Sequence, residues 1–185
     1  KTDGRRITAR GVRQGDVLEI PPSRVRQDWH RAVMAYTRAL EFAKHRLGVR
    51  DERSVPSSAM LLTLAFGLDA GCSINKVRQW FWWSVANQTY AQGANTRVVS
   101  DSDMLQSDGK HAVPWSMMEQ HLLEQSLLEP IRRNRILARG IGCLLSVRGA
   151  KDPLSGESLA TTKDIVFVTP TALVAGKAYP DADSP

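Results

Sequence analysis

The stretch 24–47 reads RVRQDWHRAVMAYTRALEFAKHRL and has the clearest periodicity in the chain. Its apolar residues recur at spacings of three and four, which is the repeat of one face of an α-helix. The members of this apolar stripe are Val25, Trp29, Val33, Tyr36, Leu40, Ala43 and Leu47. Ser23 is suited to the N-cap, and Gly48 is suited to end the helix in a left-handed conformation. We therefore predict an amphipathic helix here, with its stripe facing a core.

The next segments also have helical character. The run 59–70 is apolar on nearly all sides, which predicts a central, buried helix that ends at Gly71. Ser73 is placed to cap a following helix over 74–90. A short helix is expected over 100–106, where acidic residues favour a helix start.

Two more helices are expected further along the chain. One covers 115–128, and the other covers 131–148 with Pro130 as its first residue. Gly140 and Gly142 lie inside the second helix and lower its intrinsic propensity, so they indicate close packing against a neighbouring helix.

The predicted fold class is mainly α, a single bundle of four or five helices with short irregular or β segments at both ends. Residues 1–22 are expected to be an N-terminal extension or linker, and 23–149 the helical domain. Residues 150–185 are expected to hold a turn, a short strand at 165–168 and a tail. The chain begins at Lys1 rather than Met and ends in a polar tail, so we expect it to be a piece of a longer protein.

The composition narrows the class of protein. Of 185 residues, 42% are hydrophobic and 24% are charged, which excludes a disordered or collagen-like chain. No run of 18 apolar residues occurs, so no membrane span is expected. Cys72 and Cys143 have no metal-binding spacing and are too few for a disulfide framework. They are expected to be reduced thiols in a cytoplasmic protein.

The formal net charge of +6 favours polyanionic partners, although arginine-rich chains are also typical of GC-rich genomes. The densest basic group is at the start of the last predicted helix and consists of Arg132, Arg133, Arg135 and Arg139. These four are the candidate nucleic-acid-binding residues, with a plain solvated helix face as the alternative.

Aromatic side chains crowd into the segment 80–83. At 100° per residue they cannot all face one core, so some of them must meet a second element or an interface. The candidate interface residues are Trp80, Trp82 and Trp83. Base stacking is a further possibility for these rings, and packing in the core or between domains is the alternative.

No pattern in the chain predicts catalysis. The four histidines, His30, His45, His111 and His121, form no metal or nucleophile motif and are expected on helix surfaces. Asp101, Asp103 and Asp108 resemble the start of a calcium loop, but the glutamate at its twelfth position is missing. We therefore predict no catalytic residue, no metal and no cofactor.

Several short motifs follow one another in a recognisable order. They are Val55-Pro56-Ser57-Ser58 before an apolar helix, Trp80-Phe81-Trp82-Trp83-Ser84, Tyr90 with Gly93-Ala94-Asn95-Thr96, the acidic segment 101–105, the helix 139–145, and Lys151-Asp152-Pro153-Leu154-Ser155-Gly156. By the order and spacing of these motifs, residues 25–160 resemble the helical region of the GmrSD-like proteins. These are prokaryotic modification-dependent restriction and phage-defence nucleases.

The resemblance implies a domain placed between a ParB-like nucleotide-hydrolysing domain and an HNH nuclease domain. The catalytic motifs of both neighbours are absent. Asp3-Gly4-Arg5-Arg6 lacks the glutamines of the Asp-Gly-Gln-Gln-Arg motif, and Val166 and Phe167 stand where the HNH opening has histidines. The resemblance therefore implies a non-catalytic helical domain that links the two activities.

The expected partners are the neighbouring domains of a longer chain, double-stranded DNA through its phosphates, and a second copy of the chain. The alternative is a helical protein–protein interaction module with no nucleic-acid role, in which the aromatic segment 80–83 is the docking surface.

Overall fold

The computed structural model describes residues 18–107, 135–152 and 155–158. This part of the chain is mainly helical, as predicted, and its five helices pack together. They are α2 (Pro22–Leu47), α3 (Ser58–Asp69), α4 (Ile74–Ala86), α5 (Ala94–Gln106) and α7 (Arg135–Val147). The predicted helix over 115–128, the helix start at Pro130 and the strand at 165–168 lie outside the described residues.

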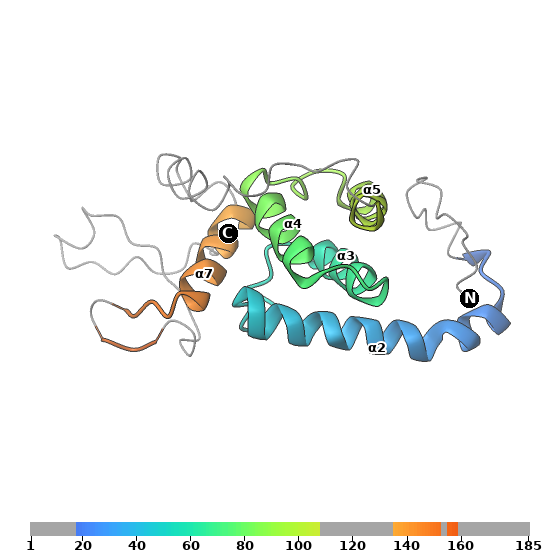
Figure 1. Ribbon diagram of the computed structural model, residues 1–185, viewed down its shortest axis with the longest axis horizontal. Coiled ribbons are helices and arrows are strands. Elements are labelled where there is room, and N and C mark those ends of the chain that lie inside the picture. Colours follow the sequence, from blue (N-terminus) through green and yellow to red (C-terminus); the bar gives the residue numbers. More distant parts are fainter. Residues whose placement is uncertain (1–17, 108–134, 153–154, 159–185) are drawn as a thin grey trace, which may run out of the picture.

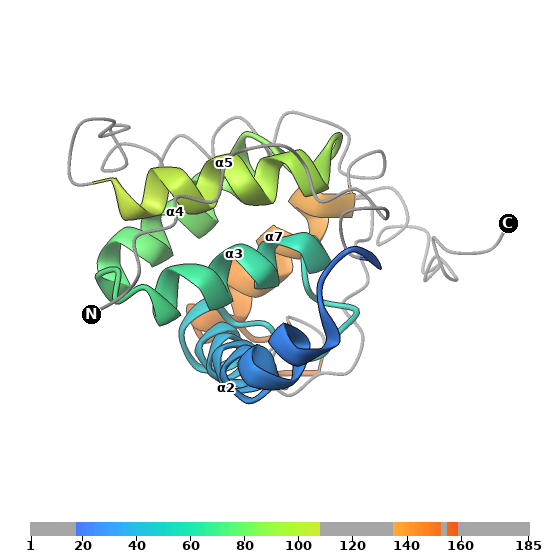
Figure 2. The same ribbon diagram turned by 90° about the vertical axis from the view of Figure 1, so that its right-hand side faces the viewer.

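The helices pack around α3. In the end-on view of Figure 2, α3 lies between α2 on one side and α5 on the other, and α3 packs against both. Helix α4 packs on α3, and α7 contacts α4 and the C-terminal end of α2 (Figure 1). Within the described residues the β pairing is a single antiparallel bridge between Lys151 and Ser158, which closes the predicted glycine-containing turn.

Helix α2 begins one residue before the predicted N-cap. Pro21 holds the cap position, Pro22 is the first helical residue, and Ser23 lies in the first turn instead of capping it. Proline suits the first helical position because its φ is already helical and its missing N–H would have no partner there. At the other end, Gly48 has a φ of 73° and ends the helix in the left-handed conformation, as predicted.

The apolar stripe of α2 does not face the core along most of its length. The buried residues of α2 are Ala35, Ala39, Ala43 and Leu47, which follow one another at intervals of four. They form a face turned roughly 55° around the helix from the predicted stripe, at 100° per residue. Ala43 and Leu47 belong to both sets, so the C-terminal end of the predicted stripe does face the core. Small alanines let the backbone of α3 approach closely, and this packing decides which face is buried.

Helix α2 is also longer than the helix it packs on. At 1.5 Å per residue, its 26 residues extend over about 39 Å and the 12 residues of α3 over about 18 Å. An ion pair of 2.7 Å between Arg31 Nη2 and Asp69 Oδ2 joins α2 to the last residue of α3. The N-terminal turns of α2 therefore project past the body of the domain (Figure 1).

Helix α3 is the central, buried helix that the sequence predicts. Its buried residues lie on several sides and are Met60, Leu61, Thr63, Leu64, Ala65 and Gly67. Gly71, with a φ of 77°, follows its C-cap residue Ala70. Ser73 then caps α4 as predicted, because its Oγ accepts a hydrogen bond from the Lys76 backbone N–H over 3.3 Å.

The boundaries of α4 and α5 differ from the prediction. Helix α4 ends at Ala86 rather than residue 90, because Gln88 takes a positive φ of 51° and turns the chain. Helix α5 begins at Ala94, earlier than the predicted start at residue 100, after Gly93 in the left-handed conformation. The first turn of α5 is polar and has weak helix propensity, which packing of α5 on α3 outweighs.

Two glycines allow α7 to pack closely against its neighbours. The sequence predicts this close packing for Gly140. A Cβ on Gly140 would lie 2.1 Å from Val85 Cγ1 of α4. A Cβ on Gly48 would lie 2.2 Å from the backbone oxygen of Cys143. Cys143 itself is buried and donates its Sγ–H to the Ser54 carbonyl over 3.3 Å. Helix α7 thus seals the end of the domain where α2 and α4 meet.

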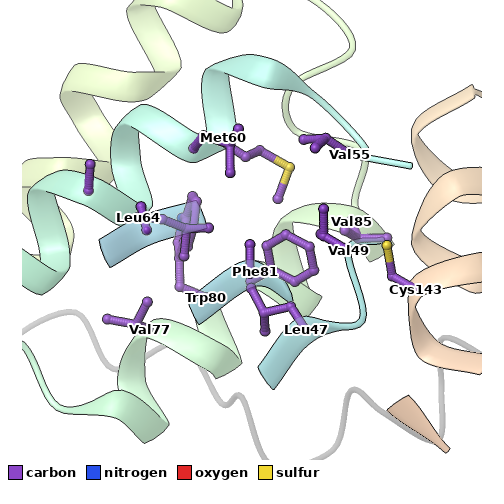
Figure 3. Packing of buried hydrophobic residues seen from close by; sticks show 14 of the residues in the cluster. Leu47, Val49, Val55, Met60, Leu64, Val77, Trp80, Phe81, Val85 and Cys143 are labelled. Atoms are coloured by element: carbon purple, nitrogen blue, oxygen red, sulfur yellow. The ribbon is translucent and has the colours of Figure 1, made fainter. Parts of the chain in front are cut away.

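One hydrophobic core connects these elements. The side chains labelled in Figure 3 come from α2, α3, α4, α7 and the segment between α2 and α3. Trp80 and Phe81 are the largest of the fully buried residues. Burial of the Cys143 thiol raises its pKa to about 12, so this cysteine is an unreactive core residue.

We predict that Gly140→Ala lowers the free energy of unfolding by about 1–3 kcal/mol, because the new methyl overlaps Val85. Alanine has a higher helix propensity than glycine, so propensity alone would raise the free energy of unfolding. A measured decrease would show that the overlap with Val85 outweighs propensity. The check is urea unfolding of a double-mutant cycle with Val85→Ala, which removes the overlapping methyl groups. Gly140→Ala should cost less in the Val85→Ala background, and an equal cost in both would contradict the close contact.

Candidate functional site

Of the four candidate DNA-binding arginines, Arg139 is the one whose side chain the structure describes. Arg139 is exposed, and its Nη1 donates a hydrogen bond to the Val55 carbonyl over 3.2 Å. Part of its guanidinium therefore holds α7 to the segment between α2 and α3. Arg135 is the first residue of α7, and Arg132 and Arg133 lie outside the described residues.

The three candidate interface tryptophans have different surroundings. Trp80 is fully buried, and Trp82 is 6% exposed and packs edge-to-face on Phe81 at 5.1 Å. Trp83 is half-buried. The rings do not form one exposed platform, so within this domain Trp80 and Trp82 serve the core and Trp83 reaches the surface.

Trp80 takes part in a polar network around a buried carboxylate. Asp101 of α5 is 1% exposed, and its Oδ2 accepts hydrogen bonds from Trp80 Nε1 over 2.8 Å and Tyr90 Oη over 3.1 Å. Tyr90 Oη also lies 2.9 Å from Thr63 Oγ1 of α3. The network therefore joins α3, α4, the following loop and α5.

The charge of Asp101 has one cationic neighbour in this network. Arg97 Nε lies 2.8 Å from Asp101 Oδ1, one turn earlier on α5, although its N–H is not aligned for a hydrogen bond. The Arg97 guanidinium also lies 5.5 Å from the centre of the Trp83 ring, at cation–π distance. Arg97 thus lies close to both the buried carboxylate and the half-buried Trp83 ring.

Burial dominates the electrostatics of this network. Desolvation raises the pKa of Asp101 above its ordinary value, against the opposing effects of the Trp80 hydrogen bond and the Arg97 charge. Burial likewise raises the pKa of the Tyr90 hydroxyl. Both groups are enclosed and bonded to protein partners, so the arrangement positions helices rather than offering a base to a substrate.

A row of exposed apolar side chains lies along α2. Five members of the predicted stripe are between 37% and 65% exposed, with Trp29 at the upper limit. We name this set the outer stripe; it consists of Val25, Trp29, Val33, Tyr36 and Leu40. A hollow of about 570 Å³ lies at its N-terminal end, bounded by Ile20, Val25 and Trp29 together with Arg24 and Asp28.

The spacing of the outer stripe is visible in the sequence, but the prediction that these five residues face the core is wrong. The signal that distinguishes the two faces is the alanine spacing at 35, 39 and 43, since small residues at intervals of four mark a face for close helix contact. No comparable signal reveals the Asp101 network. Its members Thr63, Trp80, Tyr90 and Asp101 lie on different elements and meet only in the folded chain.

Other kinds of site were sought in the described ranges. His30 and His45 are exposed, as expected, whereas His111 and His121 lie outside these ranges. No group of three or more potential metal ligands occurs in the part of the chain that the structure describes. No helix in that same part combines the length and the apolar character that crossing a membrane requires.

Comparisons with known proteins add no assignment: no family model, no curated protein and no solved structure matches this chain.

We predict that the Asp101 carboxylate makes stability depend on pH. Because its pKa is raised in the folded state, the fold binds the proton more tightly than the unfolded chain does. The stabilisation from the protonated form is therefore present at low pH and is lost as pH rises through the folded-state pKa. Asp101→Asn cannot titrate, so the stability of the wild type relative to this variant should fall as pH rises from about 4.

Urea unfolding at several pH values measures this difference, with Asp103→Asn on the same helix as the matched control. A difference that stays constant or grows with pH would show that hydrogen bonds and Arg97 outweigh burial at Asp101. Asp101→Ala, which leaves the Trp80 and Tyr90 donors without their acceptor, should cost about 3 kcal/mol at low pH. This cost should become smaller as pH rises, because the alanine variant cannot titrate either.

Proposed function

We propose that this chain is a non-catalytic helical module that holds other domains or proteins together, with α2 as its docking element. The observation that carries the proposal is the outer stripe, a row of large apolar side chains on a helix that projects beyond the packed body. Exposed contiguous apolar surface on a folded domain marks interaction sites. The docking element that we propose is therefore α2 and not the aromatic segment 80–83 of α4, because most rings of that segment are buried in the core.

The network around Asp101 supports a scaffold role. It ties three helices together through buried polar contacts, and a body held in this way moves as a unit. A rigid body with one projecting helix can hold two partners in a set relative position. We place this module, following the resemblance of its motifs, between the nucleotide-hydrolysing and nuclease activities of a GmrSD-like restriction or phage-defence protein.

Photo-crosslinking in the native cells tests the docking role. A benzophenone amino acid replaces Trp29 on the outer stripe, and the matched control carries it at Leu62, an exposed residue of α3. We expect a protein adduct, or an intramolecular link to another domain of the parent chain, from position 29 and not from position 62. Equal labelling at both positions, or a nucleic-acid adduct at 29, would overturn the proposal.

Contact with DNA phosphates is the second candidate, favoured by the net charge of +6. Charge reversal of Arg132, Arg133 and Arg135 should weaken binding to duplex DNA and flatten its salt dependence, because each phosphate contact releases counterions. Arg139→Glu is measured separately, since Arg139 also holds the Val55 carbonyl.

The measurement is a gel shift at about 50 and about 200 mM salt. Reversal of three exposed arginines on α2, Arg24, Arg26 and Arg38, makes the same change of charge elsewhere and is the control. An equal loss in both variants would indicate diffuse attraction rather than a basic site. If the unaltered protein gives no shift at either salt concentration, the DNA-binding function is excluded and docking remains as the proposed function.

A further inference from the structure

We propose that the outer stripe of α2 binds an amphipathic helix with acidic flanks, supplied by a partner protein or domain. This inference rests on the proposed docking function and names the chemistry of its partner. Three properties of α2 carry it: the width of the apolar stripe, the charges beside it, and the exposed tryptophan at its N-terminal end.

The width of the outer stripe fits a partner helix. Val25, Trp29, Val33, Tyr36 and Leu40 follow spacings of four, four, three and four. The last four have the alternating spacing of a two-helix seam. All five lie within roughly 80° of the helix circumference, narrower than the apolar face of more than about 100° by which a helix covers a core. A lipid surface suits a broad apolar face, so the narrow seam favours a helix over a membrane.

The charges of α2 indicate that its partner carries negative charge. The helix carries six lysines and arginines against two acidic residues, and Asp28 is already 3.7 Å from Arg24. Arg26 and Lys44 lie on helix positions that border the outer stripe, are exposed, and form no ion pair with any other described residue. Acidic side chains on the flanks of a partner helix would meet these cations at the rim of the seam.

The N-terminal end of the stripe offers an anchor. Trp29 is 65% exposed beside the hollow that Ile20 and Val25 also border. Tryptophans that become buried on association contribute strongly to binding, because they remove a large apolar area from water. A large apolar side chain of the partner helix would enter this hollow and cover Trp29.

A second copy of this chain fits less well. Pairing two α2 helices along their outer stripes places Arg26 and Lys44 of both copies at the rim of one seam, with no acidic partner among the described residues for either. Like charges at the rim of an interface oppose association and steer copies apart. The electrostatics thus favour a partner of opposite charge.

The test uses two synthetic helical peptides with leucine at every a and d heptad position. One carries glutamate at the e and g positions and the other carries lysine there. Binding of each labelled peptide to the whole chain is followed by fluorescence anisotropy at about 50 and about 500 mM salt, conditions that differ strongly in screening. Anionic lipid vesicles are a third probe, and sedimentation of the protein alone reports dimers.

We expect the acidic peptide to bind at least about tenfold more tightly than the basic one at low salt, with a smaller ratio at high salt. Val33→Asp should abolish binding, whereas Leu62→Asp on α3 should leave it unchanged. Both side chains are exposed, so circular dichroism should show intact folding. The double reversal Arg26→Glu with Lys44→Glu should remove or invert the preference for the acidic peptide.

The contrary outcomes separate the two proposals. Equal affinities that both depend on Val33 would overturn the acidic partner and leave the docking function intact. Binding to vesicles in preference to both peptides, or a dimer that Val33→Asp dissociates, would assign the stripe to a membrane or to a second copy. Failure of both peptides together with no crosslink at position 29 would overturn the docking function itself.

Discussion

One buried carboxylate, that of Asp101, organises the body of the domain. It accepts hydrogen bonds from Trp80 and Tyr90, and Tyr90 in turn reaches Thr63 on the central helix. An unpaired charge at this depth would be costly, so the surrounding helices must supply these donors in one arrangement. The network therefore specifies how α3, α4 and α5 fit together, while the apolar core supplies most of the stabilisation.

The helical class of the fold could be predicted because local patterns determine it. Periodicity located α2 and α4, an apolar run located α3, and Gly48 and Ser73 marked helix ends that the structure confirms. The length of α5 could not be predicted in the same way, because its first turn is polar and is held by packing on α3. Where a tertiary contact decides the outcome, a pattern within one segment does not report it.

The orientation of α2 shows the same limit more clearly, and it concerns the candidate site directly. Hydrophobicity alone favours the face with Trp29 and Leu40 for the core, yet the face with Ala35 and Ala39 is buried. Close approach of two backbones can outweigh the burial of larger side chains, because it brings many atoms into contact at once. The large residues that remain outside are what make α2 a candidate docking surface.

The contact at Gly48 has a mechanical meaning for this surface. Because α7 lies against the backbone there, the C-terminal end of α2 is held at a packed junction while its N-terminal turns extend beyond α3. In a helix held in this way, the position of each side chain relative to the body is fixed, since each residue adds about 1.5 Å of length and about 100° of rotation. A partner seated near Trp29 is thus held at a set distance and bearing from the body, as a spacer between two working parts requires.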